Sequence, residues 1–281
     1  MKNIMRLLLR MKCTEKCDYE MNYHYNLQGL IYTLIKDTEY AYVHDKAGFK
    51  FFCFSNLIPI TSPIVNGEIR TLVVSSPDIS FISVLYEKMK MLDGLIKVGN
   101  MKFRFDSAQR LNLKVPETGS CTMITGTPII IRIPWEKYKK YGISPPINYE
   151  YLYWRRDHPL EVFLSQLWDN LQRKYNEYFR IDNANQNLDS DIEPFSFFSK
   201  FIFRKQISTK LFIKNSEQIA RGTTWEFLFE RPECRDITQF ALDGRTGIFF
   251  PFKAIVVVSL FHSCSFFFLG LNSNSTPRLS L

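Results

Sequence analysis

The sequence predicts an α+β protein that is built from two similar domains in tandem. Its 281 residues are enough for two small domains, each with a buried core of its own. Hydrophobic residues make up 46% of the chain and charged residues 23%, values that are typical of globular proteins. Strand and helix patterns follow one another in the first half as strand, helix, strand, strand, helix, strand, and the second half repeats most of that order.

Hydrophobic periodicity predicts the elements of the first half. The stretch Asn26–Asp37 places its leucines and isoleucines at helical spacing, with Asn26 as the N-cap. Pro77 suits the first turn of a second helix that runs to about Leu92, and Gly94 ends it. Strands are expected at Ile4–Met11, Lys50–Ser55, Ile69–Ser75 and Leu95–Phe105. This order is that of the ferredoxin-like split β-α-β unit, which RNA-recognition domains share.

The second half predicts the same order less completely. Its longest helix pattern is His158–Arg180. Gly126 and Pro128 interrupt the apolar stretch Cys121–Ile133, which predicts either a long strand or a strand pair. The remaining predictions are a loop-like stretch at Tyr138–Tyr153, a polar loop at Asp182–Glu193, antiparallel strands at Phe195–Ile213 and Thr223–Glu230, and a short helix at Arg231–Leu242.

We expect the two ferredoxin-like domains at residues 1–115 and 116–243, and the composition changes after them. Residues 244–281 contain no acidic residue but seven of the 25 phenylalanines. We hypothesise that this tail is translated out of frame, with the break near Gly244–Gly247. A native tail and a membrane-associated tail stay open as alternatives.

One part of the tail resembles a membrane span and another a strand. Ala254–Leu271 has 18 residues without a formal charge, which is long enough to raise a membrane span. Its serines and its histidine count against a span, so no membrane partner is expected. Ala254–Ser259 has high β propensity and could add a closing strand to the second sheet.

Composition and absent motifs disfavour most enzymes of the common cofactor classes. The net charge of +8 suits a polyanion such as nucleic acid, although only +5 of it belongs to the first 243 residues. Four histidines and six cysteines have no zinc-site spacing, and Walker, GxGxxG, HExxH and GxSxG motifs are absent, so we expect neither metal nor cofactor. The apolar run Leu7–Leu9 is too short for a signal peptide, which favours the cytoplasm.

Three residues of the first half have the chemistry for RNA cleavage without a metal. Tyr32 lies about 130° from the apolar stripe of its helix, so it points away from the core. His44 and Lys50 follow it in a loop and at the start of a strand. Such cleavage must remove the 2′-hydroxyl proton, protonate the leaving 5′-oxygen and stabilise extra negative charge. Histidine can transfer either proton, and a cation such as lysine assists tyrosine and attracts phosphate. A surface tyrosine and two solvated loop residues are the simpler interpretation on chemistry alone.

A resemblance favours the cleavage interpretation. The segment HYNLQGLIYTLIK, followed by YVHDKAGFKFFCFS, closely resembles the N-terminal signature of the CRISPR repeat-cleaving endoribonucleases, which mature guide RNA. In that family a helical tyrosine, a later histidine and a lysine six residues after the histidine form the cleavage site. Tyr32, His44 and Lys50 occupy those places.

The resemblance extends over about residues 4–243, with weaker matches at Thr127–Ile129 and in the GTTWEFLF stretch, Gly222–Phe229. The family fold has two ferredoxin-like domains, in agreement with the pattern above. The chain departs from the family after Leu242, where the family's glycine-rich loop of the GFGxxNSxGFG kind is missing.

The resemblance implies metal-independent cleavage of CRISPR repeat RNA by 2′-hydroxyl attack, which leaves a 2′,3′-cyclic phosphate and a 5′-hydroxyl. It implies Tyr32 as proton acceptor, His44 as proton donor and Lys50 as the group that stabilises the transition state. Because histidine is chemically the better base, the reverse assignment of the two proton transfers stays open. The alternative function is a non-catalytic ferredoxin-like RNA-binding subunit of a CRISPR effector complex. CRISPR repeat RNA is the expected partner, and whether the protein forms a homodimer or joins such a complex stays open.

Overall fold

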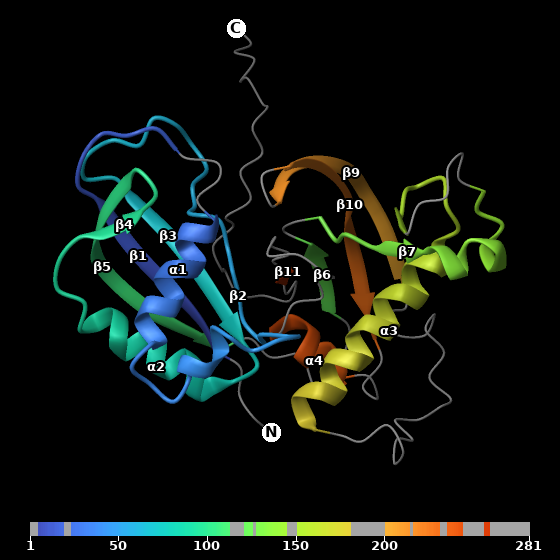
Figure 1. Cartoon of the computed structure of the whole chain (residues 1–281), viewed down its shortest axis with the longest axis horizontal. Coiled ribbons are helices and arrows are strands. Elements are labelled where there is room, and N and C mark those ends of the chain that lie inside the picture. The colour runs from blue at the N-terminus through green and yellow to red at the C-terminus, as the bar shows by residue number, and fades with distance from the viewer. Residues whose placement is uncertain are drawn as a thin grey trace, which may run out of the picture.

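The computed structural model describes residues 5–19, 24–112, 121–125, 128–144, 151–180, 200–213, 216–230, 235–243 and 256–258. These residues form two larger sheets, each with helices on one face (Figure 1). The predicted mixture of helices and sheets is confirmed. The predicted polar loop at Asp182–Glu193 and most of residues 244–281 lie outside the described residues.

The first sheet has the strand order β2-β3-β1-β5-β4, and all its neighbouring strands are antiparallel. Its elements are β1 (Met5–Cys13), α1 (His24–Ile35), β2 (Cys53–Phe54), β3 (Ile69–Ser76), α2 (Ile79–Lys90), β4 (Ile96–Val98) and β5 (Met101–Asn112). One helix follows β1 and the other follows β3, so β2-β3-β1-β5 has the ferredoxin-like order. β4 adds an outer strand beside β5.

Some elements of the first sheet differ from the prediction. α1 begins at His24, so Asn26 lies inside the helix and is not its N-cap. Pro77 precedes α2 instead of lying in its first turn. The expected single strand Leu95–Phe105 is the hairpin β4–β5, because the chain turns at Gly99, whose φ of 63° suits a residue without a Cβ.

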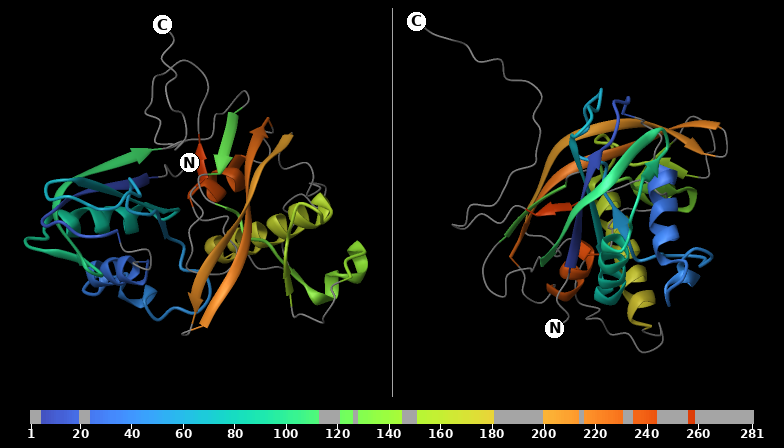
Figure 2. Two further views of the ribbon diagram at one scale, coloured as in Figure 1. Left: turned by 90° about the horizontal axis from the view of Figure 1, so that it is seen from above. Right: turned by 90° about the vertical axis from the view of Figure 1, so that its left-hand side faces the viewer.

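The second sheet has the order β11-β6-β10-β9, again with antiparallel neighbours only. Its elements are β6 (Cys121–Thr125), α3 (Leu160–Phe179), β9 (Lys200–Ile213), β10 (Ser216–Phe229), α4 (Arg235–Asp243) and β11 (Val256–Val258). Strand order and helix positions repeat those of the first sheet. β9 and β10 form a long twisted ribbon, drawn in orange in Figure 2. β11 pairs with β6 at the sheet edge, as the β propensity of the tail predicts.

Three stretches of the second half differ from the prediction. Cys121–Ile133 contributes to two sheets, because β6 joins the second sheet whereas β7 (Arg132–Pro134) pairs with β8 (Tyr151–Tyr153). The expected loop at Tyr138–Tyr153 therefore contains a strand. β10 begins at Ser216, seven residues before the predicted strand Thr223–Glu230.

Each of the two larger sheets has an apolar core of its own. Leu9, Ile31 and Phe81 are buried in the first core, which joins β1, α1 and α2. The second core is aromatic, and the ring of Trp225 lies 4.6 Å from that of Phe163 and 5.7 Å from that of Trp154. The predicted boundary at residue 115 falls between the two, although the division into two domains stays a prediction.

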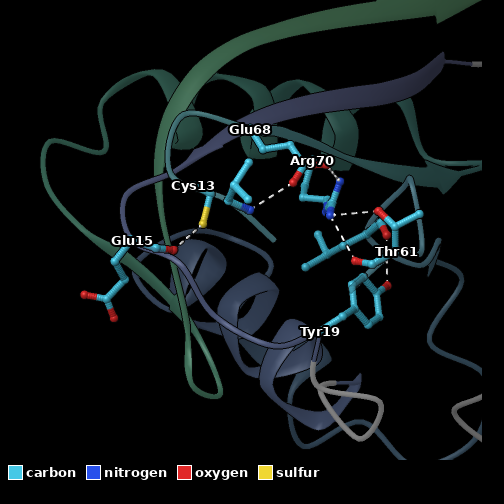
Figure 3. A network of polar contacts seen from close by, with 8 residues as sticks. Cys13, Glu15, Tyr19, Thr61, Glu68 and Arg70 are labelled. Atoms are coloured by element: carbon cyan, nitrogen blue, oxygen red, sulfur yellow. Dashed lines mark hydrogen bonds and ion pairs between the residues drawn. The ribbon is translucent and has the colours of Figure 1, made fainter. Parts of the chain in front are cut away.

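A buried arginine fixes the long connection between β2 and β3. Arg70 at the start of β3 is fully buried, and its guanidinium pairs with the carboxylate of Glu68. Its Nη2 donates to the carbonyl oxygen and the Oγ1 of Thr61, both at 3.1 Å (Figure 3). Tyr19 Oη donates to the carbonyl oxygen of Leu57 at 2.8 Å. These bonds satisfy polar groups whose burial without a partner would destabilise the fold.

A substitution at Gly222 of β10 tests how closely the second sheet is packed. A Cβ at this position would lie 2.7 Å from the Cβ of Pro128 and 3.0 Å from the carbonyl oxygen of Ile129. Since backbone is part of the obstruction, we expect Gly222→Ala to lower the free energy of unfolding by about 1–3 kcal/mol. Thermal unfolding would measure the loss. The control is Gly29→Ala on the exposed side of α1, where nothing lies within 4 Å and alanine is the better helix former. Equal melting temperatures for the two variants would contradict the packing.

Candidate active site

The three residues singled out in the sequence lie together. Tyr32 belongs to α1, His44 follows the short 3₁₀ helix η1 (Ala41–Val43), and Lys50 lies three residues before β2. Lys50 Nζ donates to Tyr32 Oη at 2.8 Å and to the carbonyl oxygen of His44 at 2.7 Å. The rings of Tyr32 and His44 meet edge to face, with centroids 4.8 Å apart.

The hydroxyl of Tyr32 is held by a second donor that the sequence analysis missed. Gln28, one turn earlier on α1, donates from Nε2 to Tyr32 Oη at 2.6 Å. The i, i+4 spacing is a signal that could have revealed this contact. The Tyr32 ring is half-buried and packs on Phe52, with centroids 6.1 Å apart. Tyr32 Oη accepts both of these hydrogen bonds, and one more position at this oxygen is left for a substrate group.

The turn that carries His44 is fixed to the start of α2. Tyr40, just before η1, is buried and donates from Oη to Asp78 Oδ2 at 3.0 Å. The other oxygen of Asp78 caps α2, accepting from the backbone N–H groups of Ser80 and Phe81. Burial and the bond to Asp78 raise the pKa of Tyr40, so its phenol stays protonated and keeps donating.

The imidazole of His44 is open to solvent. Its Nδ1 lies 2.5 Å from Asp45 Oδ1, and the side chains of His44 and Asp45 are 62% and 87% exposed. An exposed pair of this kind contributes little to stability. Asp45 instead occupies one ring nitrogen, which leaves Nε2 as the nitrogen that a substrate can reach.

His158 and the thiols of Cys13 and Cys17 belong to other parts of the structure. His158, just before α3, accepts the backbone N–H of Arg155, and burial lowers its pKa. Cys13 and Cys17 are free thiols, and burial followed by the neighbouring Cys13 raises the pKa of Cys17 to about 11. The described ranges contain no cluster of three or more His, Cys, Asp or Glu suited to a metal ion. Among their helices, none is long and apolar enough to span a membrane.

Positive charge lies on the open face of the first sheet. Leu9 and Met11 of β1 are buried on the face that α1 and α2 cover. The alternate residue Lys12 is exposed on the opposite face, directly across from the exposed Arg104 of β5. Like charges in such a pair repel each other, and a polyanion beside them would relieve the repulsion.

Comparison with known proteins identifies the family. The chain is 32% identical over 247 residues to the CRISPR-associated endoribonuclease Cas6 2 of Methanocaldococcus jannaschii, in a match that covers 85% of this chain and 93% of the relative. The chain belongs to the Cas6 family of CRISPR-associated endoribonucleases. No protein-family model matches it.

Solved structures agree on the fold of this Cas6 chain. A CRISPR-associated Cas6 protein superposes with a TM-score of 0.61 at 21% identity and covers 91% of this chain and 99% of its own. The product of a Cas6-related gene from Pyrococcus furiosus has a TM-score of 0.63 at 18% identity and covers 92% of this chain and 100% of its own. These structures agree with the fold, and the match to the M. jannaschii relative confirms the resemblance seen in the sequence at the level of the family.

Proposed function

We propose that this Cas6 protein cleaves CRISPR repeat RNA at one phosphodiester and so releases mature guide RNAs. The convergence of Tyr32, His44 and Lys50 carries the proposal, because these side chains offer the groups that 2′-hydroxyl attack requires. Its relative from M. jannaschii is named an endoribonuclease. Another similar structure, with a TM-score of 0.61, is of an RAMP protein that binds different RNA substrates.

In the proposed reaction Tyr32, as tyrosinate, takes the proton of the 2′-hydroxyl. The 2′-oxygen then bonds to phosphorus and the bond from phosphorus to the 5′-oxygen breaks. Lys50 Nζ and Gln28 Nε2 already donate to Tyr32 Oη, so both can stabilise negative charge on that oxygen. The products are a 2′,3′-cyclic phosphate on one fragment and a 5′-hydroxyl on the other.

His44 gives the leaving 5′-oxygen its proton. When both ring nitrogens are protonated, Asp45 accepts the hydrogen on Nδ1 and Nε2 is left to donate to the leaving group. The opposite direction of proton transfer, with His44 as base, uses the same atoms and stays open. Proton exchange with water restores both residues after each cut.

Lys50 stabilises the charge that develops on the phosphorane. An ammonium has three donors, and two of those of Lys50 are bonded to Tyr32 and to the backbone of His44. The third is available for a non-bridging phosphate oxygen. Base, acid and positive charge thus all come from side chains, and we propose that the reaction needs no metal ion.

We also propose that the protein folds as two ferredoxin-like domains, at residues 1–115 and 116–243. Two separate cores and two sheets with the same strand order support the division. The cationic pair Lys12 and Arg104 supports RNA binding on the open face of the first domain. The same pair is compatible with the alternative function, a non-catalytic RNA-binding subunit of an effector complex, which binds RNA without cutting it.

Replacing the histidine separates the two functions. His44→Ala should slow single-turnover cleavage of repeat RNA by about 10²–10⁴-fold, because a general acid or base is lost. RNA affinity should stay nearly unchanged, since phosphate contacts from many lysines and arginines supply most of the binding. His158→Ala is the matched control, a histidine with a structural hydrogen bond, and should cleave at the wild-type rate. Cleavage by His44→Ala at the wild-type rate would remove His44 from the mechanism, and binding without cleavage by the wild type would favour the non-catalytic subunit.

The nucleophile and the metal requirement are tested on the substrate side. A repeat RNA with a single 2′-deoxynucleotide at the cut position should not be cleaved, because the attacking hydroxyl is missing. Unmodified RNA should be cleaved at an unchanged rate in excess EDTA. Cutting of the deoxy substrate would mean that water attacks phosphorus, and loss of activity in EDTA would mean that a metal takes part.

A further inference from the structure

Three consecutive side chains beside the candidate active site lie in three different environments. Lys50 reaches Tyr32 Oη. Phe51 packs against Tyr178 of α3, with ring centroids 5.1 Å apart. Phe52 is buried in the first core, where its ring stacks on that of Phe81 at 5.3 Å. Phe51 is thus the member of this triplet whose ring packs onto the second core.

The backbone of Phe51 makes this divergence possible. Its φ of 45° lies in the left-handed region, which bulky side chains rarely adopt. In an extended chain Lys50 and Phe52 would share one face, and Phe51 would point to the other. The left-handed φ of Phe51 turns the chain, so Lys50 and Phe52 reach different environments. A strained conformation of this kind persists only where the surrounding contacts hold it.

Contacts with the last turns of α3 hold this loop. Lys46 Nζ lies 4.4 Å from the centre of the Phe51 ring and 3.3 Å from Glu177 Oε1. Lys174 Nζ lies 5.3 Å from the centre of the Phe49 ring. Aromatic and cation–π contacts therefore fix the segment on both sides of Lys50, from a helix that belongs to the second core.

We propose that Phe51 is a positioning residue, through which α3 holds the ammonium of Lys50 at the candidate active site. The inference rests on the proposed function. Lys50 must keep two hydrogen bonds of 2.7 and 2.8 Å at once, and each weakens steeply when its donor moves. A loop released from α3 leaves Lys50 present but misplaced. The second half of the protein thereby sets the cleavage rate without contacting the reacting atoms.

Single-turnover cleavage at saturating enzyme tests this role. Phe51→Ala and Tyr178→Ala should each slow cleavage by about 10–100-fold, as a misplacement near 1 Å can do, with RNA affinity unchanged. The double variant should be no slower than the worse single variant, because both changes break one contact. Phe51→Tyr keeps an aromatic ring at this position and should cleave at the wild-type rate. Tyr175→Ala is the control, since its ring packs on Phe179 and Phe240, and it should leave the rate unchanged.

A second readout does not depend on RNA cleavage. Acetylation of lysines by an amine-reactive reagent, followed by mass spectrometry, measures how accessible Lys50 is in the full-length protein. Lys50 should react faster in Phe51→Ala than in the wild type, while the two proteins have the same melting temperature. In Tyr175→Ala, Lys50 should react as slowly as in the wild type. Unchanged Lys50 reactivity and cleavage in Phe51→Ala would overturn the proposal. Faster labelling in a protein whose wild type does not cut RNA would instead count against the proposed function and leave the positioning role standing.

Discussion

The ammonium group of Lys50 connects the separate segments of the candidate active site. Its two hydrogen bonds join a helix side chain, Tyr32 Oη, to a loop backbone, the carbonyl oxygen of His44. A lysine ammonium supplies both hydrogen bonds and still has a third donor left. It also carries the positive charge that a neutral side chain would lack. The geometry of the three residues, and with it any shared chemistry, depends on where this one nitrogen lies.

The fold positions that nitrogen from several directions. α1 presents Tyr32 and Gln28 on one face while its other face is buried. Asp78 ties the turn before His44 to the N-terminus of α2. The loop that carries Lys50 lies against α3, which packs on the other core. The site is thus formed in the first half of the chain and supported by the second.

Local sequence patterns determine several elements of this protein, and these elements are predictable. Helical spacing predicts the helices near Leu27–Ile35 and His158–Arg180, and β propensity predicts a closing strand around Val256–Val258. The split of Leu95–Phe105 into a hairpin was missed, because a single Gly99 in a turn leaves little trace in a strand pattern. The N-cap predicted at Asn26 is wrong, because the helix starts two residues earlier.

The candidate site was named from a spacing and a resemblance, but its contacts were not predictable. The residue type of Phe51 does not predict a left-handed backbone, since phenylalanine disfavours this conformation. The full burial of Arg70 is likewise not predictable from its residue type, because arginine is rarely buried. It follows from the tertiary partners of Arg70 alone. Gln28 is the exception, because helix geometry places it beside Tyr32.

The chemical groups at the two new RNA ends show whether side chains of this protein activate the 2′-hydroxyl of the RNA itself. Mass spectrometry of both fragments after complete cleavage identifies the ends. We predict a 2′,3′-cyclic phosphate, lighter than a 3′-phosphate by one water, on the upstream fragment and a 5′-hydroxyl on the downstream fragment. A 3′-hydroxyl with a 5′-phosphate would show that water attacks from the other side of phosphorus, and would contradict the roles given to Tyr32, His44 and Lys50.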